Sequence, residues 1–337
     1  MAGLGGNARV LVFERMDPTD RSIEWLREKG LDLTLGKRMW DPGFQRYSED
    51  QIIAAAKGYD AAMGASGAQF SRRVIESLPE LRFISKFGMG YDSIDVAAAT
   101  ERGILVSNTP DDFNLLAVAE HTIASMLALK KQLLVWTPGF MRNGGWRGDV
   151  FARYLAGNTV GIIGLGRIGR AVAERLAGWR AEIIAYDPFV EDAPPNVSLV
   201  DLPSLLERSD IVTLHATPSA GNRHIIDRAA LARMKPSALL INTGRASLVD
   251  YAALREVLAT RRIGGAALDV YETEPPDPDD PLFRAENVLA TPHSAAWTFE
   301  TLESMGWHGA RNLWAMMNAE PNEDVINADA TRIRKSA

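Results

Sequence analysis

The amino-acid sequence predicts an α/β protein with two doubly wound parallel-sheet lobes. Short apolar runs rich in β-branched residues alternate with longer helical patterns along most of the chain, which is typical of parallel sheets covered by helices. One long helical stretch, residues 114–134, separates two such series. Only the second series opens with a glycine-rich turn. A chain of 337 residues is long enough for two domains of ordinary size.

The first series predicts about five strands, which we expect at residues 10–13, 31–35, 61–65, 83–86 and 104–107. Helical patterns lie between them, and glycines at their ends fit helix C-caps. The second series predicts six or seven strands, at residues 159–164, 182–187, 197–200, 211–216, 238–243, 264–269 and 287–292. The tail is helical again, from residue 298 to residue 321.

Composition narrows the class of protein. The apolar share of 46% and the charged share of 24% are typical of a globular chain. No apolar run approaches the roughly 18 residues of a membrane span, and the N-terminus lacks a signal-peptide pattern. The chain has no cysteine, which excludes thiol catalysis. A net charge of -6 without a basic block argues against nucleic acid or membrane partners. We expect a cytoplasmic protein.

The turn "GLGRIG" has the spacing of a dinucleotide-binding loop, with Gly164, Gly166 and Gly169. The first glycine permits the tight turn, the second lets a pyrophosphate approach, and the third lets helix pack on strand. Arg167 and Ile168 begin the following helix, whose free N–H groups suit phosphate. The next strand ends at Asp187, 187 − 164 = 23 residues later. A carboxylate there favours NAD over NADP. The alternative is that the glycines only shape a turn and Asp187 caps a helix.

Ionisable residues follow three later strands of the second series. Arg245 comes after the first of them, Asp269 and Glu274 after the second, and His293 after the third. Because carboxyl ends of parallel strands share one edge, these side chains should lie on one rim. An arginine grips a carboxylate, and an imidazole beside a carboxylate is a general acid–base. The set predicts hydride transfer to a 2-keto acid. The alternative is a purely structural His293.

The other histidines have less specific surroundings. His121 lies in the long helix and is expected to serve packing. His215 ends a strand and is expected to line the coenzyme site. His224 and His308 are expected on the surface or in helices. We expect no metal site.

Together these motifs resemble the D-isomer-specific 2-hydroxyacid dehydrogenases. The resemblance covers nearly the whole chain, through "KFGMGYDSID", "ILVSNTP", "AVAEHT", "GIIGLGRIG", "INTGRASLVD", "AALDVYETEP" and "TPHSAA". It implies that the catalytic arginine, glutamate and histidine are Arg245, Glu274 and His293. The residues flanking the arginine, Gly244 and Ala246, differ from the usual family pattern but remain small.

The resemblance also explains why the glycine turn lies in mid-chain. It implies a flavodoxin-like substrate domain made of residues 1–110 and 297–337, with an NAD-binding Rossmann domain, residues 111–296, inserted between them. It implies that Met89 and Gly90 offer N–H groups to the substrate carboxylate, beside Lys86 and Trp297. It places His215, Ala216, Thr217, Thr243, Gly244, Asp269 and His293 along the coenzyme.

The sequence does not identify the side chain of the substrate. We expect a small 2-keto acid such as hydroxypyruvate or glyoxylate, with D-3-phosphoglycerate dehydrogenase as the alternative. Phosphite dehydrogenases share the three catalytic residues, whereas formate dehydrogenases usually carry glutamine in place of Glu274. An alternative of another class is an NAD-sensing module similar to the C-terminal-binding corepressors. The resemblance further implies a homodimer, and we expect no regulatory domain after about residue 330.

Overall fold

The structure is a computed structural model that describes residues 8–44, 46–64, 68–110, 112–148, 150–219 and 221–330. The chain divides into two compact units. Unit 1 comprises residues 1–114 and 298–337, and unit 2 comprises residues 115–297. Within the described ranges, no helix combines the length and the apolar character that crossing a membrane requires.

Unit 1 is built on a five-stranded parallel sheet with the order β2-β1-β3-β4-β5, which is the flavodoxin-like order. The strands are β1 Arg9–Val12, β2 Asp32–Leu35, β3 Ala61–Gly64, β4 Phe83–Lys86 and β5 Leu105–Ser107. Each lies within one residue of a predicted strand, although Ala65, the predicted end of the third, is outside the described residues. The helices of the first part of this unit are α1 Arg21–Glu28, α2 Glu49–Ala56, α3 Arg72–Glu76 and α4 Val96–Glu101.

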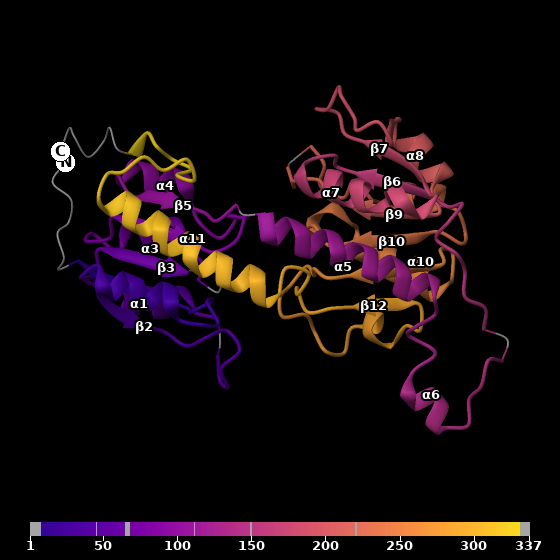
Figure 1. Ribbon diagram of the computed structural model, residues 1–337, viewed down its shortest axis with the longest axis horizontal. Helices are drawn as coiled ribbons and strands as arrows, with labels where there is room; N and C mark the ends of the chain where they lie inside the picture. The colour runs from indigo at the N-terminus through magenta and orange to yellow at the C-terminus, as the bar shows by residue number, and fades with distance from the viewer. Residues whose placement is uncertain are drawn as a thin grey trace. The chain divides into compact units, whose positions relative to one another are not determined.

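The last helix of the chain returns to the first sheet. Helix α11, Phe299–Met317, begins at the N-cap Thr298 and contacts β3, β4 and β5 (Figure 1). Close approach depends on its small residues. A Cβ on Gly309 would lie 2.5 Å from the ring of Phe87, and a Cβ on Gly306 would lie 2.5 Å from Asp17. The C-terminal part of the chain thus completes the fold of unit 1.

Unit 2 contains a seven-stranded parallel sheet with the order β12-β11-β10-β9-β6-β7-β8. This is the order of a Rossmann fold with one added strand. The strands are β6 Thr159–Ile163, β7 Glu182–Tyr186, β8 Ser198–Leu199, β9 Ile211–Leu214, β10 Leu239–Asn242, β11 Gly265–Leu268 and β12 Val288–Ala290. The strand order reverses between β6 and β9, and ligands of such sheets bind beyond the carboxyl ends of the strands at that point.

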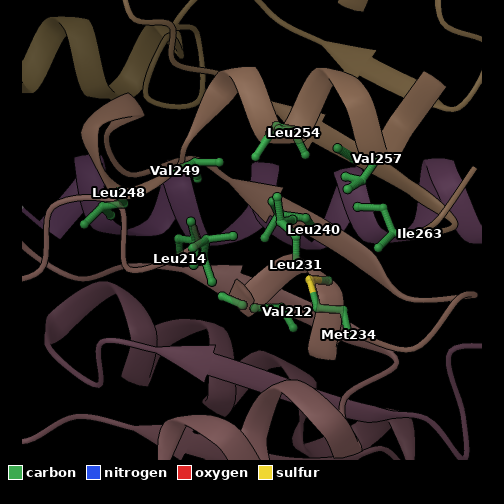
Figure 2. Packing of buried hydrophobic residues seen from close by; sticks show 14 of the residues in the cluster. Val212, Leu214, Leu231, Met234, Leu240, Leu248, Val249, Leu254, Val257 and Ile263 are labelled. Carbon is green, nitrogen blue, oxygen red and sulfur yellow. The ribbon is translucent and has the colours of Figure 1, made fainter. Parts of the chain in front are cut away.

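Helices cover both faces of the second sheet (Figure 1). They are α5 Asp112–Lys130, most of which belongs to this unit, α6 Pro138–Arg142, α7 Arg167–Leu176, α8 Leu202–Arg208, α9 Arg228–Arg233 and α10 Tyr251–Ala259. Three short 3-10 segments add Ala177–Trp179, Ala246–Leu248 and Pro281–Arg284. Figure 2 shows one buried cluster, in which Val212, Leu214 and Leu240 of the sheet pack against Leu231, Leu254 and Val257 of α9 and α10. Truncating such a leucine to alanine typically costs about 2–5 kcal/mol.

The long helix differs from its predicted range of 114–134. It starts two residues earlier and ends at Lys130. Gln132 adopts a left-handed backbone with φ 57°, and the N–H of Leu133 donates to the carbonyl of Ala128. This is a Schellman-type end, which is usually formed by glycine. Arg153 N–H then donates to the free carbonyl of Lys130 at 2.7 Å. The apolar pattern continues beyond this point, and so it could not mark the helix end.

Candidate active site

The glycine turn between β6 and α7 has the geometry expected of a dinucleotide loop. Gly164 has φ 93°, and a Cβ there would lie 2.4 Å from the backbone nitrogen of Ala216. A Cβ on Gly169 would lie 2.1 Å from the carbonyl oxygen of Gly164. By contrast, nothing lies within 4 Å of a Cβ built on Gly166, the N-cap of α7. The turn is therefore crowded on the protein side and open at the helix N-terminus, where a pyrophosphate binds.

Asp187 follows β7 and is held by two backbone amides. Its Oδ2 accepts from the N–H of Leu165 at 2.8 Å, and its Oδ1 accepts from the N–H of Phe189 at 3.0 Å. Each carboxylate oxygen can accept a second hydrogen bond. The carboxylate is thus oriented by the glycine turn itself and keeps capacity for ribose hydroxyls.

His215 follows β9, next to the glycine turn. Its Nε2 lies 2.9 Å from Oγ1 of Thr213, and its Nδ1 is buried without a hydrogen-bond partner among the described residues. Burial lowers the pKa of His215 to about 3, so the ring is neutral near pH 7. The open helix end, the oriented Asp187 and this unsatisfied buried nitrogen all fit a bound dinucleotide.

The burial of His215 gives a pH-dependent stability with a defined sign. Its folded-state pKa lies below the ordinary value of 6.5, so acid protonates the unfolded chain first. Its contribution is complete above pH 6.5 and is lost as the pH falls toward 3, by up to about 1.4 kcal/mol per pH unit. Urea unfolding across this window should show a shallower pH dependence for His215→Gln than for the unchanged protein. Equal slopes would contradict a buried neutral imidazole.

Glu274 and His293 form a direct pair. Oε2 of Glu274 lies 2.7 Å from Nδ1 of His293, and its Oε1 accepts from the N–H of Tyr271 at 3.2 Å. An ionised carboxylate only accepts, so Nδ1 carries the hydrogen and Nε2 is left for chemistry. The histidine side chain is 49% exposed and that of Glu274 is 19% exposed. The imidazole of His293 is thus held by a carboxylate at Nδ1 and is also accessible to solvent.

The loop that carries His293 is fixed by Asp269, which is 1% exposed. The Asp269 carboxylate accepts from Oγ1 of Thr291 at 2.6 Å and from the amides of Ser294 and Ala295 at 2.7 and 2.9 Å. His293 itself has φ 52°, a left-handed conformation that costs energy in a non-glycine residue. Asp269 therefore orients the loop that carries His293, a structural role that its sequence position did not reveal.

Two further side chains support the same loop and were missed in the sequence. Tyr271 donates from its hydroxyl to the Thr291 carbonyl at 2.8 Å, and burial raises the pKa of Tyr271 to about 12. Nε2 of His121 lies 3.2 Å from Oγ1 of Thr291. His121 was expected to serve packing only, but it makes this polar contact from α5. The two residues lie 20 and 170 positions from Thr291, so no local pattern links them.

Arg245 stands in a turn after β10 that its neighbours hold in shape. Asn242 accepts from the amide of Gly244 at 3.1 Å and donates from Nδ2 to the carbonyl of Arg245 at 3.1 Å. Nη1 of Arg245 donates to the Gly244 carbonyl at 2.9 Å. Thr243 is buried, with Oγ1 at 3.0 Å from Oγ1 of Thr122. Since β10, β11 and β12 are neighbours in the sheet, the structure brings Arg245, Glu274 and His293 to one edge.

The predicted substrate residues occupy several environments. Lys86 is buried at the end of β4, and its Nζ donates to the carbonyl of Phe87 at 3.0 Å. Met89 and Gly90 are partly exposed in the following loop. Trp297 is 40% exposed and closes the turn after His293, where its N–H donates to the Ser294 carbonyl at 2.9 Å. Ala216 and Thr217 follow His215 without regular structure.

Similarity to known proteins identifies the family of this chain. Residues 123–295 match the family model described as D-isomer specific 2-hydroxyacid dehydrogenase, NAD binding domain. The chain belongs to the D-isomer-specific 2-hydroxyacid dehydrogenase family. The predictions of this family, of two parallel-sheet α/β lobes with a Rossmann domain, and of NAD as the cofactor are thereby confirmed. The family consists of NAD-dependent oxidoreductases that act on CH–OH groups.

Three similar proteins show how far the likeness extends. The chain is 35% identical to a D-3-phosphoglycerate dehydrogenase of Archaeoglobus fulgidus over 95% of its own length but only 59% of that protein. It is 36% identical to a glyoxylate reductase of Thermofilum pendens over 88% of both chains. The crystal structure of the TT0316 protein of Thermus thermophilus is 29% identical, with a TM-score of 0.85 over 94% of this chain and 99% of that one. The chain therefore spans little more than half of the first relative and most of the other two.

Proposed function

We propose that this protein is an NAD-dependent D-2-hydroxyacid dehydrogenase that also reduces the corresponding small 2-keto acid. The observation that carries the proposal is the 2.7 Å contact between Glu274 and Nδ1 of His293. A half-exposed imidazole with a carboxylate on one nitrogen can exchange a proton through the other. This is the group that interconversion of a hydroxyl and a carbonyl requires.

The roles of the residues follow from their chemistry. Bound NADH would supply hydride to the keto carbon, and NAD⁺ would accept it in the reverse direction. Protonated His293 donates from Nε2 to the carbonyl oxygen, and Glu274 stabilises the imidazolium before that transfer. The guanidinium of Arg245 pairs with the substrate carboxylate, since its planar fork suits two oxygens. In this proposal the N–H groups of Met89 and Gly90 also bind substrate.

We propose hydroxypyruvate, glyoxylate or a similarly small acid as the substrate. The glyoxylate reductase relative supports this choice, because the two proteins match over 88% of both chains. A phosphorylated substrate needs additional cations, and the ammonium of Lys86 is buried against the Phe87 carbonyl. The phosphoglycerate dehydrogenase relative keeps that substrate as the second candidate.

Oxidation of NADH in the presence of candidate keto acids tests the proposal. The panel comprises glyoxylate, hydroxypyruvate, pyruvate, phenylpyruvate, oxaloacetate and phosphohydroxypyruvate, with phosphite and NAD⁺ as a separate reaction. The highest kcat/KM is expected on glyoxylate or hydroxypyruvate. A preference for phosphohydroxypyruvate would select the second candidate. Tight NADH binding without turnover of any compound would overturn the proposal in favour of an NAD-sensing module.

We also propose that the protein is a cytoplasmic homodimer. Residues 133–148 and 150–154 support the second part, because large apolar side chains are exposed there, including Trp146 at 66%, Phe151 at 72% and Tyr154 at 78%. Figure 1 shows the segment, with α6, extending away from the seven-stranded sheet. Exposed apolar surface of this extent is typical of an interface between protein chains.

Trp146→Glu is expected to shift the protein from dimer to monomer. A charge in the centre of an apolar interface would remain buried and unpaired, which typically costs several kcal/mol. Light scattering after gel filtration should give twice the chain mass of 36.9 kDa for the unchanged protein and a smaller mass for the variant. Phe299→Glu, at another exposed aromatic residue outside the segment, serves as the control. A monomeric unchanged protein would reject the dimer.

A further inference from the structure

The loop after β4 is held by two consecutive residues that follow β5. Oγ1 of Thr109 accepts from the N–H of Gly88 at 2.7 Å, and the N–H of Thr109 donates to the Gly88 carbonyl at 3.2 Å. Nδ2 of Asn108 donates to the carbonyl of Met89 at 2.7 Å. Gly88 has φ 88°, which a side chain would disfavour. Three hydrogen bonds thus fix a short loop whose backbone shape needs glycine.

These hydrogen bonds involve only some of the backbone groups of the loop. They use both backbone groups of Gly88 and the carbonyl of Met89. The N–H groups of Met89 and Gly90 donate to no acceptor among the residues that the structure describes. Both residues are partly exposed. Successive backbone N–H groups without an acceptor in a fixed loop are suited to bind an anion.

Asn108 is itself anchored before it reaches the loop. Its N–H donates to the carbonyl of Asp324 at 3.3 Å, and its carbonyl accepts from Nδ2 of Asn312 at 2.7 Å. The carboxylate of Asp324 lies 2.6 Å from Nε2 of His308. These partners belong to α11 and to the segment after it. The C-terminal part of the chain therefore sets the position of Asn108, and Asn108 sets the position of Met89.

We infer that Asn108 and Thr109 are positioning residues that hold the N–H groups of Met89 and Gly90 in place for the substrate carboxylate. The inference rests on the proposed function for the identity of the anion. Neither residue touches substrate in this account. Both act by occupying the carbonyls and the first amide of the loop, so that only the two remaining donors face the ligand. Pre-organised donors bind an anion without the cost of ordering the loop.

Asn108→Asp tests the inference, because it removes the Nδ2 donor and puts a carboxylate oxygen beside the Met89 carbonyl. The KM for the keto acid should rise about tenfold or more, with kcat changed less, since carboxylate binding is lost equally from the ground and transition states. The dissociation constant of NADH should not change. Thr109→Val should act in the same direction, and Thr109→Ser, which keeps the hydroxyl, should restore the KM.

Asn327 provides a matched control in the same unit. It is 7% exposed against 8% for Asn108. Its Nδ2 donates to the Ile104 carbonyl at 2.8 Å and its Oδ1 accepts from the N–H of Val106 at 2.9 Å. Asn327→Asp should lower the unfolding temperature about as much as Asn108→Asp and leave the KM unchanged. An unchanged KM in Asn108→Asp, or an equal rise in Asn327→Asp, would overturn the inference.

A second readout separates this inference from the proposed function. Hydrogen exchange of the Gly88 amide should be slow in the unchanged protein, faster in Thr109→Val and slow again in Thr109→Ser. Oxamate, a keto-acid analogue that is not reduced, should bind the NADH complex at least tenfold more weakly in Asn108→Asp. If no keto acid is turned over, the proposed function fails while these two measurements still judge the positioning role. Unchanged exchange and unchanged oxamate affinity would reject it.

Discussion

His293→Ala is expected to lower kcat for keto-acid reduction by about 10²–10⁴-fold, the usual contribution of a positioned general acid. The fold should survive, because the side chain is half exposed and its loop is held by Asp269 through Thr291, Ser294 and Ala295. NADH affinity should change far less than kcat. Steady-state kinetics on the best keto acid, with NADH titration of the same preparation, measures both quantities.

His224→Ala is the matched control for this substitution. His224 and His293 both have left-handed backbones, with φ 51° and 52°, so alanine meets the same conformational cost at either position. His224 lies apart from Glu274 and His293 in sequence, and its N–H donates to the Ser247 carbonyl. Its variant should keep full kcat. A comparable loss of kcat in both variants would assign the effect to backbone strain and remove His293 as the acid.

Glu274→Gln tests the electrostatic role of Glu274 separately from proton transfer by His293. Glutamine can still accept from Nδ1 of His293 through its Oε1, but it no longer stabilises the imidazolium electrostatically. The loss in kcat should be smaller than that of His293→Ala. Added to His293→Ala, it should cause little further loss, because two residues that act as one unit are not additive. Additive losses would show that Glu274 works independently of His293.

The sequence predicts those parts of the structure that depend on the spacing of residues close together in the chain. The strands of both sheets follow apolar runs bounded by turn residues, and the glycine turn with Asp187 lies within 24 consecutive positions, from Gly164 to Asp187. The end of α5 was misplaced because a glutamine, Gln132, takes the left-handed position that glycine usually marks. The carbonyl of Lys130 accepts there from the N–H of Arg153, which is 23 positions away and gives no local signal.

The hydrogen bonds that hold the loops of the candidate site could be identified only from the folded structure. The family resemblance implies that Asp269 lies along the coenzyme, and the structure adds that its carboxylate accepts three hydrogen bonds from residues 22 to 26 positions later. Asn108 and Thr109 look like an ordinary strand end until their partners in the loop of Gly88 are seen about 20 positions earlier. Such contacts join segments that the order of the strands brings together. Neither composition nor periodicity shows which polar groups form these hydrogen bonds.

Two glycines of the same turn are expected to lose different amounts of stability when a methyl group is added. In Gly169→Ala the new Cβ would lie 2.1 Å from the Gly164 carbonyl oxygen, so backbone must move. We expect a loss of about 1–3 kcal/mol in the free energy of unfolding, as for overpacking elsewhere. In Gly166→Ala the Cβ meets nothing within 4 Å, and the backbone with φ -74° suits alanine. Its unfolding free energy should fall by less than about 1 kcal/mol, the usual scale of an N-cap change.

Among the variants that remain folded, the loss of NADH affinity should follow the reverse order. Gly166→Ala should weaken NADH binding more than Gly169→Ala, although it costs less stability. The space beside Gly166 is where the pyrophosphate of a dinucleotide comes closest to the backbone, so a methyl group there should weaken NADH binding by tenfold or more in a stably folded protein. Gly178→Ala, at an exposed glycine with nothing within 4 Å, should change neither quantity by much. Urea unfolding and NADH fluorescence titration of the three variants measure the two effects separately. If Gly166→Ala bound NADH as the unchanged protein does, the open end of α7 would not be the phosphate site, and the coenzyme would have to be held mainly through Asp187 and the residues after β9.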